Sequence, residues 1–117
     1  MKNTLITTPC AGATLKYFGV TGRPTMDLWD NRNLWEEALE DAGYTLESQI
    51  GELEKNETVI GARLDLALLA KSNPEIKGFI IKVKRHVLVL DTSGKTVVDT
   101  DPRVQDHRTI VDVLSVV

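Results

Sequence analysis

The chain divides into two parts with different sequence patterns, and this division constrains the fold more than any other feature. Up to about residue 73 the apolar residues recur at helical spacing, whereas from Lys77 onward short segments are rich in β-branched residues. Strands that follow helices, rather than alternating with them, are typical of an α+β protein. We therefore expect N-terminal helices over about residues 8–73, packed on a C-terminal antiparallel sheet that forms a meander over about residues 77–117.

Capping threonines and helix-stopping glycine or proline residues bound the expected helices. These helices span about residues 9–18, 25–42 and 58–71, and the polar cluster 30–33 is expected to break the second one. Residues 45–57 are acidic and weakly patterned, which predicts a loop with one short strand. The positions expected to be buried are Ala11, Leu15, Phe18, Leu28, Trp35, Ala38, Leu39, Ala42, Val59, Ala62, Leu66 and Leu69.

In the second part, strands are expected over about residues 78–83, 85–90, 96–100 and 110–117, with a turn at 91–95.

The hairpin register bears on a candidate site. If Leu90 faces Thr96 across the turn, His86 faces Thr100, and a slip of one residue brings His86 opposite Asp99 or Asp101 instead.

Length and composition indicate one globular domain over residues 1–117, with 42% apolar residues, 26% charged residues and a net charge of −3. A mildly acidic chain without a long apolar run predicts no nucleic-acid partner and no membrane partner. The N-terminus lacks the apolar region of a signal peptide, so we expect a cytoplasmic protein. The single cysteine excludes an intramolecular disulfide and a zinc site of several thiolates, and no motif predicts another metal or a cofactor.

That cysteine, Cys10, falls in the first turn of the first expected helix. Backbone N–H groups there lack intrahelical partners and, with the helix dipole, favour a thiolate. One of these groups can also stabilise an oxyanion formed when the thiolate attacks a carbonyl. The alternative is a buried structural cysteine, a common fate of a free thiol.

His86 opens the apolar strand that leads to the hairpin. An acidic residue on the returning strand, Asp99 or Asp101, can bond one imidazole nitrogen and fix the tautomer, which leaves the other nitrogen to accept a proton. The alternative is a surface His–Asp pair of little energetic weight. The other histidine, His107, lies in the polar stretch 103–108, which predicts a solvated loop.

A cysteine that opens an N-terminal helix, followed by helices and then by a histidine and an aspartate on a hairpin, is an ordered set. The segments that carry it are Pro9-Cys10-Ala11-Gly12-Ala13, His86-Val87-Leu88-Val89-Leu90 and Thr96-Val97-Val98-Asp99-Thr100. In this order the chain resembles the papain-like cysteine peptidases, most of all the compact papain-like proteins of tailed bacteriophages and bacteria.

The resemblance implies a minimal papain-like fold and a catalytic triad of Cys10, His86 and Asp99, with Asp101 as the alternative third member. It implies an oxyanion hole made by the Cys10 N–H with Asn3 or an upstream threonine such as Thr8, and no cofactor. The function that it implies is hydrolysis of an amide or isopeptide bond in a protein or peptide substrate. Acyl transfer by the same triad, and a catalytically inactive papain-like module that binds a host or partner protein, are the alternatives.

Overall fold

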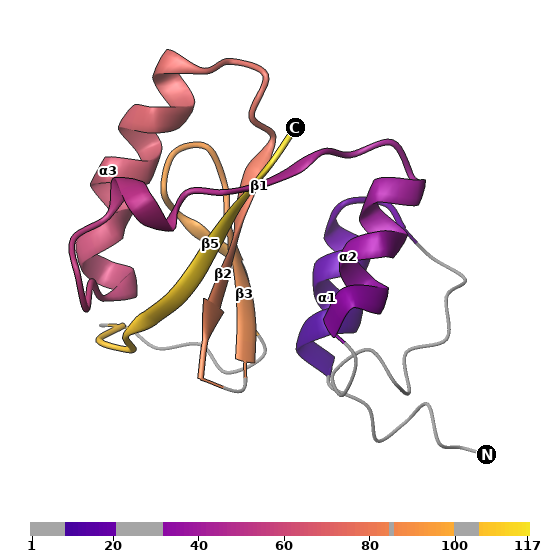
Figure 1. Ribbon diagram of the computed structural model, residues 1–117, viewed down its shortest axis with the longest axis horizontal. Coiled ribbons are helices and arrows are strands. Elements are labelled where there is room, and N and C mark those ends of the chain that lie inside the picture. The colour runs from indigo at the N-terminus through magenta and orange to yellow at the C-terminus, as the bar shows by residue number, and fades with distance from the viewer. Residues whose placement is uncertain (1–8, 21–31, 85, 100–105) are drawn as a thin grey trace.

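The computed structural model describes residues 9–20, 32–84, 86–99 and 106–117 in three layers (Figure 1). A five-stranded sheet lies in the middle. Helix α3 (Val59–Ser72) covers one face, and helices α1 (Pro9–Tyr17) and α2 (Arg32–Asp41) cover the other. The α+β prediction is therefore confirmed, with the helices largely before the strands in the chain.

The strands do not follow one another in space as a simple meander. Their spatial order is β1 (Leu46–Ser48), β5 (Ile110–Val116), β2 (Gly78–Val83), β3 (His86–Leu90) and β4 (Thr96–Val98), and all neighbours are antiparallel. A short 3₁₀ helix, η2 (Ile50–Glu52), follows β1. The predicted meander holds for β2, β3 and β4, but β5 returns to the other side of β2.

The position of β5 follows from its burial. Val113 packs on the α3 side of the sheet, whereas Leu114 and Val116 pack on the α1 side, so this strand needs cover on both faces. The short β4, with Val97 exposed, is better suited to an edge. The short strand predicted within residues 45–57 is β1, and it forms the opposite edge beside β5.

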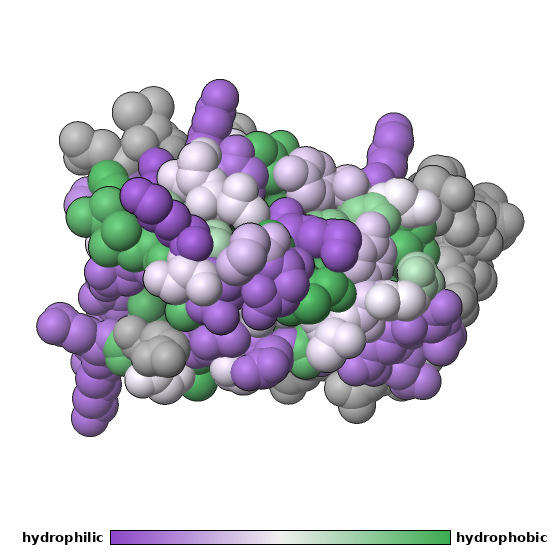
Figure 2. Space-filling view, turned by 90° about the horizontal axis from the view of Figure 1, so that it is seen from above, coloured by the Kyte–Doolittle hydropathy of each residue, from purple (hydrophilic) through white to green (hydrophobic). Residues whose placement is uncertain are grey.

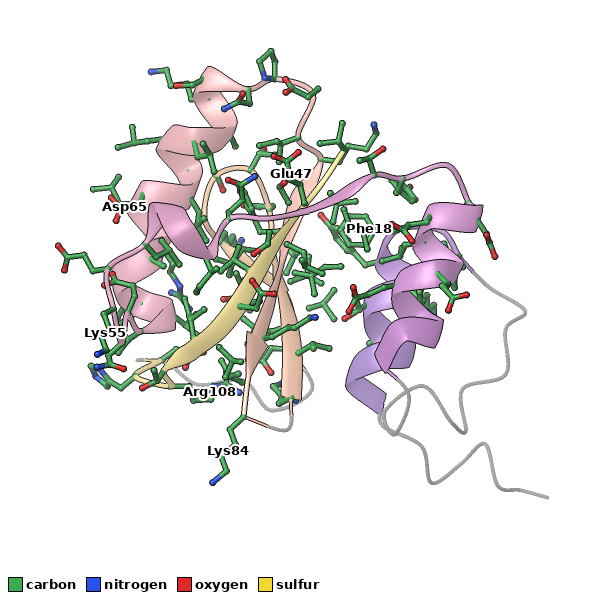
Figure 3. The ribbon with its side chains drawn as sticks, in the orientation of Figure 1. Phe18, Glu47, Lys55, Asp65, Lys84 and Arg108 are labelled. Carbon is green, nitrogen blue, oxygen red and sulfur yellow. The ribbon has the colours of Figure 1, made fainter. Side chains whose placement is uncertain are left out.

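Successive residues of β2 and β3 point to opposite faces of the sheet and into two separate cores. Val87 and Val89 pack with Leu15 and Phe18 of α1, and Phe18 is drawn between this helix and the sheet in Figure 3. Leu88 packs with α3. Because both faces are covered, these strands read as almost continuous apolar runs in the sequence.

Most of the residues expected to be buried are buried, and one is exposed. Ala42 is exposed because α2 ends at Asp41 and Ala42 lies in the following turn. The side chains of Ala11, Leu28 and Trp35 lie outside the described part of the chain. Those confirmed as buried are Leu15, Phe18, Ala38, Leu39, Val59, Ala62 and Leu66, and Leu69 is half-buried.

Glycines end α1 and α2, as the sequence predicts. Gly19 and Gly43 have φ of +79° and +102°, which closes each helix and lets the next N–H bond back to a carbonyl of the last turn. The Tyr44 hydroxyl then donates to the Phe18 carbonyl at 2.7 Å, so the two helix ends are held together.

Helix α3 begins against the segment that precedes β5. The Thr58 hydroxyl accepts from the Gly61 N–H at 3.2 Å, which is the predicted N-cap. The N–H groups of Val59 and Ile60 donate to the carbonyls of Arg108 and Asp106 at 3.0 and 2.9 Å. Free N–H groups of the first turn are thus satisfied by residues 106–108, and this fixes that segment beside α3.

Candidate active site

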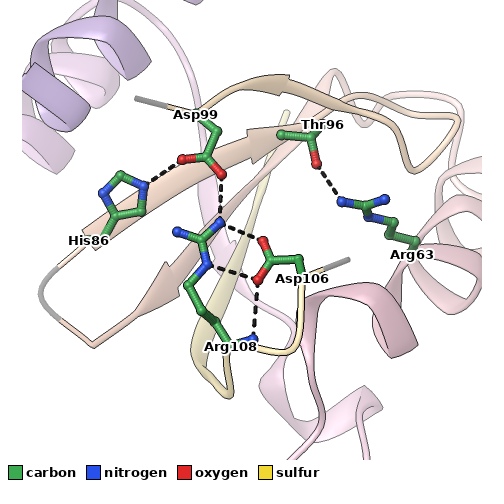
Figure 4. A network of polar contacts seen from close by, with 6 residues as sticks. All are labelled: Arg63, His86, Thr96, Asp99, Asp106 and Arg108. Atoms are coloured by element: carbon green, nitrogen blue, oxygen red, sulfur yellow. Dashed lines mark hydrogen bonds and ion pairs between the residues drawn. The ribbon is translucent and has the colours of Figure 1, made fainter. Parts of the chain in front are cut away.

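The structure brings together two of the residues singled out in the sequence, His86 and Asp99. His86 is the first residue of β3, and Asp99 follows β4 directly. The Nε2 atom of His86 lies 2.7 Å from Oδ1 of Asp99 (Figure 4). The Asp99 side chain is only 3% exposed and that of His86 15%. A carboxylate has no hydrogen to donate and therefore accepts the hydrogen bond. The contact thus places a proton on Nε2 and fixes the orientation of the imidazole ring.

A β-bulge sets the geometry of this pair. Leu90 faces Thr96, as expected, but the next pair is Val89 with Val98, because Val97 is an extra residue on β4. The expected pairing of His86 with Thr100 assumed a regular ladder, and Thr100 lies outside the described residues.

Arg108 holds the other side of the Asp99 carboxylate. Its Nη2 atom lies 2.6 Å from Oδ2 of Asp99 and 2.5 Å from Oδ2 of Asp106, and its Nε atom lies 2.8 Å from Oδ1 of Asp106. The Asp106 side chain is 1% exposed. Two buried carboxylates therefore share one guanidinium, and the chain of contacts runs from His86 through Asp99 and Arg108 to Asp106.

The charges in this cluster stabilise one another. Burial by itself raises the pKa of Asp106, but hydrogen bonds and the positive charge from Arg108 outweigh it and leave that pKa below its ordinary value. The hydrogen bond to Asp106, with further support from Asp99 and against the effect of burial, raises the pKa of Arg108. The guanidinium thus stays charged, and Asp99 orients His86 while sharing its own charge with Arg108.

Asp106 and Arg108 are not among the site residues that the sequence predicts. The stretch 103–108 was expected to be a solvated loop, which is wrong for these two side chains, although His107 is exposed as expected. A pattern in the sequence could have indicated this pair: an acidic and a basic residue stand two apart, directly before an apolar strand. Residues at that spacing lie on one side of an extended segment, where opposite charges can form an ion pair.

The cluster lies on the α3 side of the sheet. His86 pairs with Val83, and it lies two residues before Leu88 on β3, so the side chains of His86 and Leu88 point to the same face of the sheet. That face is the one covered by α3. Arg63 of α3 donates from Nη2 to the Thr96 hydroxyl at 2.9 Å on this side. Helix α1 packs on the opposite face of the sheet. Any group on α1 that contacts the His86 ring must therefore reach it around the end of the sheet where β3 begins.

The remaining predicted site residues are not described in full. Cys10 lies in the first turn of α1, but its side chain is outside the described part of the chain. Figure 1 shows α1 beginning at the same end of the molecule at which β3 begins. Asn3, Thr8 and Asp101 also lie outside the described residues.

Within the residues that the structure describes, no three or more His, Cys, Asp or Glu side chains are grouped so as to hold a metal ion. No helix in that same part is both long and apolar enough to cross a membrane.

No protein-family model matches this chain, and no match was found among curated proteins or solved structures.

Proposed function

We propose that this protein is a small papain-like thiol hydrolase in which Cys10 attacks an amide or isopeptide carbonyl. The observation that carries the proposal is the 2.7 Å contact between His86 and a buried Asp99 carboxylate, which prepares an imidazole for general-base work. The position of Cys10 in the first turn of a helix supports it independently, because that position favours a thiolate.

Each group in this scheme has a distinct task. With Nε2 bonded to Asp99, Nδ1 of His86 is the nitrogen that takes the thiol proton. The thiolate of Cys10 adds to the carbonyl carbon, and the oxyanion is held by the Cys10 N–H with Asn3 or Thr8. The protonated His86 gives its proton to the leaving amine as the carbon–nitrogen bond breaks. Water, deprotonated by His86, then hydrolyses the thioester and releases the acid and the thiol.

The face of the sheet to which His86 points restricts how Cys10 can reach its imidazole. Helix α1 packs on the opposite face of the sheet through Leu15 and Phe18. The contact between Cys10 and Nδ1 of His86 therefore has to be made around the end of the sheet where β3 begins. A protein or peptide substrate would then approach at this end of the sheet, where α1 and β3 both begin.

The test is hydrolysis of a panel of peptide and isopeptide substrates by the wild type, Cys10→Ala, His86→Ala and His107→Ala. His107 is the matched control, since it is the second of the two histidines and is exposed. We expect the first two variants to lose turnover and His107→Ala to keep it. Turnover that survives in Cys10→Ala would refute the proposal.

The second candidate is a catalytically inactive module that binds a host or partner protein. It is favoured by the Asp99 carboxylate, of which both oxygens are engaged in a network with Arg108 and Asp106 on the α3 side of the sheet, as in a structural ion cluster. On this reading His86→Ala lowers the free energy of unfolding, and Cys10→Ala leaves partner binding and the biological effect intact. Loss of the effect in a folded Cys10→Ala variant would exclude it.

A further inference from the structure

The outer face of α3 carries a stripe of apolar side chains in contact with solvent. Ile60, Leu64 and Leu68 recur every four residues, and they are 37%, 68% and 53% exposed. The opposite face of α3 is buried through Val59 and Leu66. Seen from above in Figure 2, hydrophobic side chains gather at the end of the molecule formed by α3, among charged ones. Three large apolar side chains aligned on one exposed face mark an interaction surface.

Opposite charges bound this stripe. Glu57 precedes the helix by two residues, and its Oε1 atom would lie 2.6 Å from a Cβ atom added at Gly61, so the carboxylate sits over the first turn. Lys71 lies exposed in the last turn. Lys71 is seven residues from Leu64 within the helix, so at 100° per residue it falls within about 20° of the direction of Leu64. Glu57 lies before the helix, and its place at the opposite end of the stripe follows from its carboxylate beside Gly61. In the described part of the chain neither forms an ion pair.

We infer that this stripe is the contact between two copies of the chain, packed with their α3 helices antiparallel about a two-fold axis at Leu64. In that arrangement each residue meets the residue equally far from Leu64 on the second copy. Ile60 then meets Leu68, and Leu64 meets Leu64. The Glu57 carboxylate beside the first turn of one helix lies near Lys71 in the last turn of the other, and the first and last pairs form twice. A parallel arrangement would oppose Glu57 to Glu57 and Lys71 to Lys71, which the like charges disfavour.

The surface beside the stripe also suits this partner. A groove of about 460 Å³ runs between Leu53 and Glu54 on one side and α3 on the other, and Leu68 forms part of its wall. The antiparallel arrangement brings Ile60 of the second copy to Leu68, at the edge of this groove. The Ile60 side chain thus meets, at both ends of the contact, a hollow lined by Leu53, Leu68 and Leu69 together with polar side chains.

This inference does not depend on the proposed hydrolase activity, and it is tested by the oligomeric state of the full chain. We expect sedimentation velocity over a concentration series to show a monomer–dimer equilibrium with a dissociation constant of about 1–100 µM. Leu64→Glu should be monomeric, because it sets two carboxylates against each other on the axis. Val111→Glu is the matched control, since Val111 is also apolar and 58% exposed but lies on β5, and it should dimerise as the wild type does.

A charge exchange tests the orientation. Lys71→Glu opposes like charges at both ends and should weaken the dimer by about tenfold or more. Adding Glu57→Lys to this variant restores opposite charges and should restore the affinity. Circular dichroism checks that each variant is folded. A wild-type chain that stays monomeric at about 100 µM, or a dimer that survives Leu64→Glu, would overturn the inference.

Discussion

Asp99 holds the imidazole of His86 through a contact of 2.7 Å between Oδ1 and Nε2, and its other oxygen is held by Arg108 at 2.6 Å. The histidine therefore has a fixed orientation because the carboxylate that orients it is fixed in turn. This chain of contacts starts at His86, the first residue of β3, and reaches the segment that anchors the first turn of α3. The candidate site and the packing of α3 are for this reason expected to respond together to substitutions in the cluster.

Replacement of Arg108 should be among the most destabilising changes in the protein. Arg108→Met leaves Asp99 and Asp106 buried without their shared positive partner, and we expect a loss of about 3 kcal/mol in the free energy of unfolding. Lys84→Met is the control, because Lys84 is an exposed cation that points into solvent at the end of β2 (Figure 3). Urea unfolding of both variants measures the difference, and a fully stable Arg108→Met protein would contradict the account of the cluster.

The stability of the fold should decline in acid partly through Asp106. Its pKa in the folded protein lies below the unfolded value near 3.9, so its contribution is complete above that pH and is lost as the pH falls through the folded-state pKa. We expect Asp106→Asn to be about 2 kcal/mol less stable near neutral pH and to lose less stability below about pH 4 than the wild type. Urea unfolding at several pH values checks this, and parallel curves for the two proteins would count against it.

The turn between β3 and β4 leaves no room for a side chain at Gly94. This residue has φ of +83°, and an added Cβ atom would lie 2.5 Å from the carbonyl oxygen of Arg63 in α3. Gly94→Ala is therefore expected to cost about 2 kcal/mol or more. Gly51→Ala is the matched control, since nothing lies within 4 Å of its added Cβ atom. Equal thermal stability of the two variants would show that the turn can relax away from α3.

Local signals in the sequence predicted much of the fold. The hydroxyl of Thr58 caps α3, and Gly19 and Gly43 end the first two helices, since each device acts within a few residues of the chain. The burial of Leu15 and Leu39 followed from helical spacing in the same way.

Contacts between segments far apart in the chain could not be predicted from local sequence patterns. The pairing of β5 with both β1 and β2 depends on which strand needs cover on both faces, and a spacing rule applied to one segment does not reveal this. Likewise, Arg108 and Asp106 look like part of a polar loop in the sequence, because their burial depends on contacts with α3 and with Asp99 after β4, which are distant in the chain. The hairpin turn was predicted, whereas the bulge at Val97 changed the register near His86.

The proposed activation of Cys10 by His86 can be measured through the rate of iodoacetamide alkylation as a function of pH. Cys10 is the only cysteine, so the rate reports this thiol alone. We predict a midpoint well below the ordinary thiol value of about 8.5 in the wild type, and a clear rise in His86→Ala and Asp99→Asn. A midpoint near the ordinary value of about 8.5 that His86→Ala leaves unchanged would show that His86 does not activate Cys10.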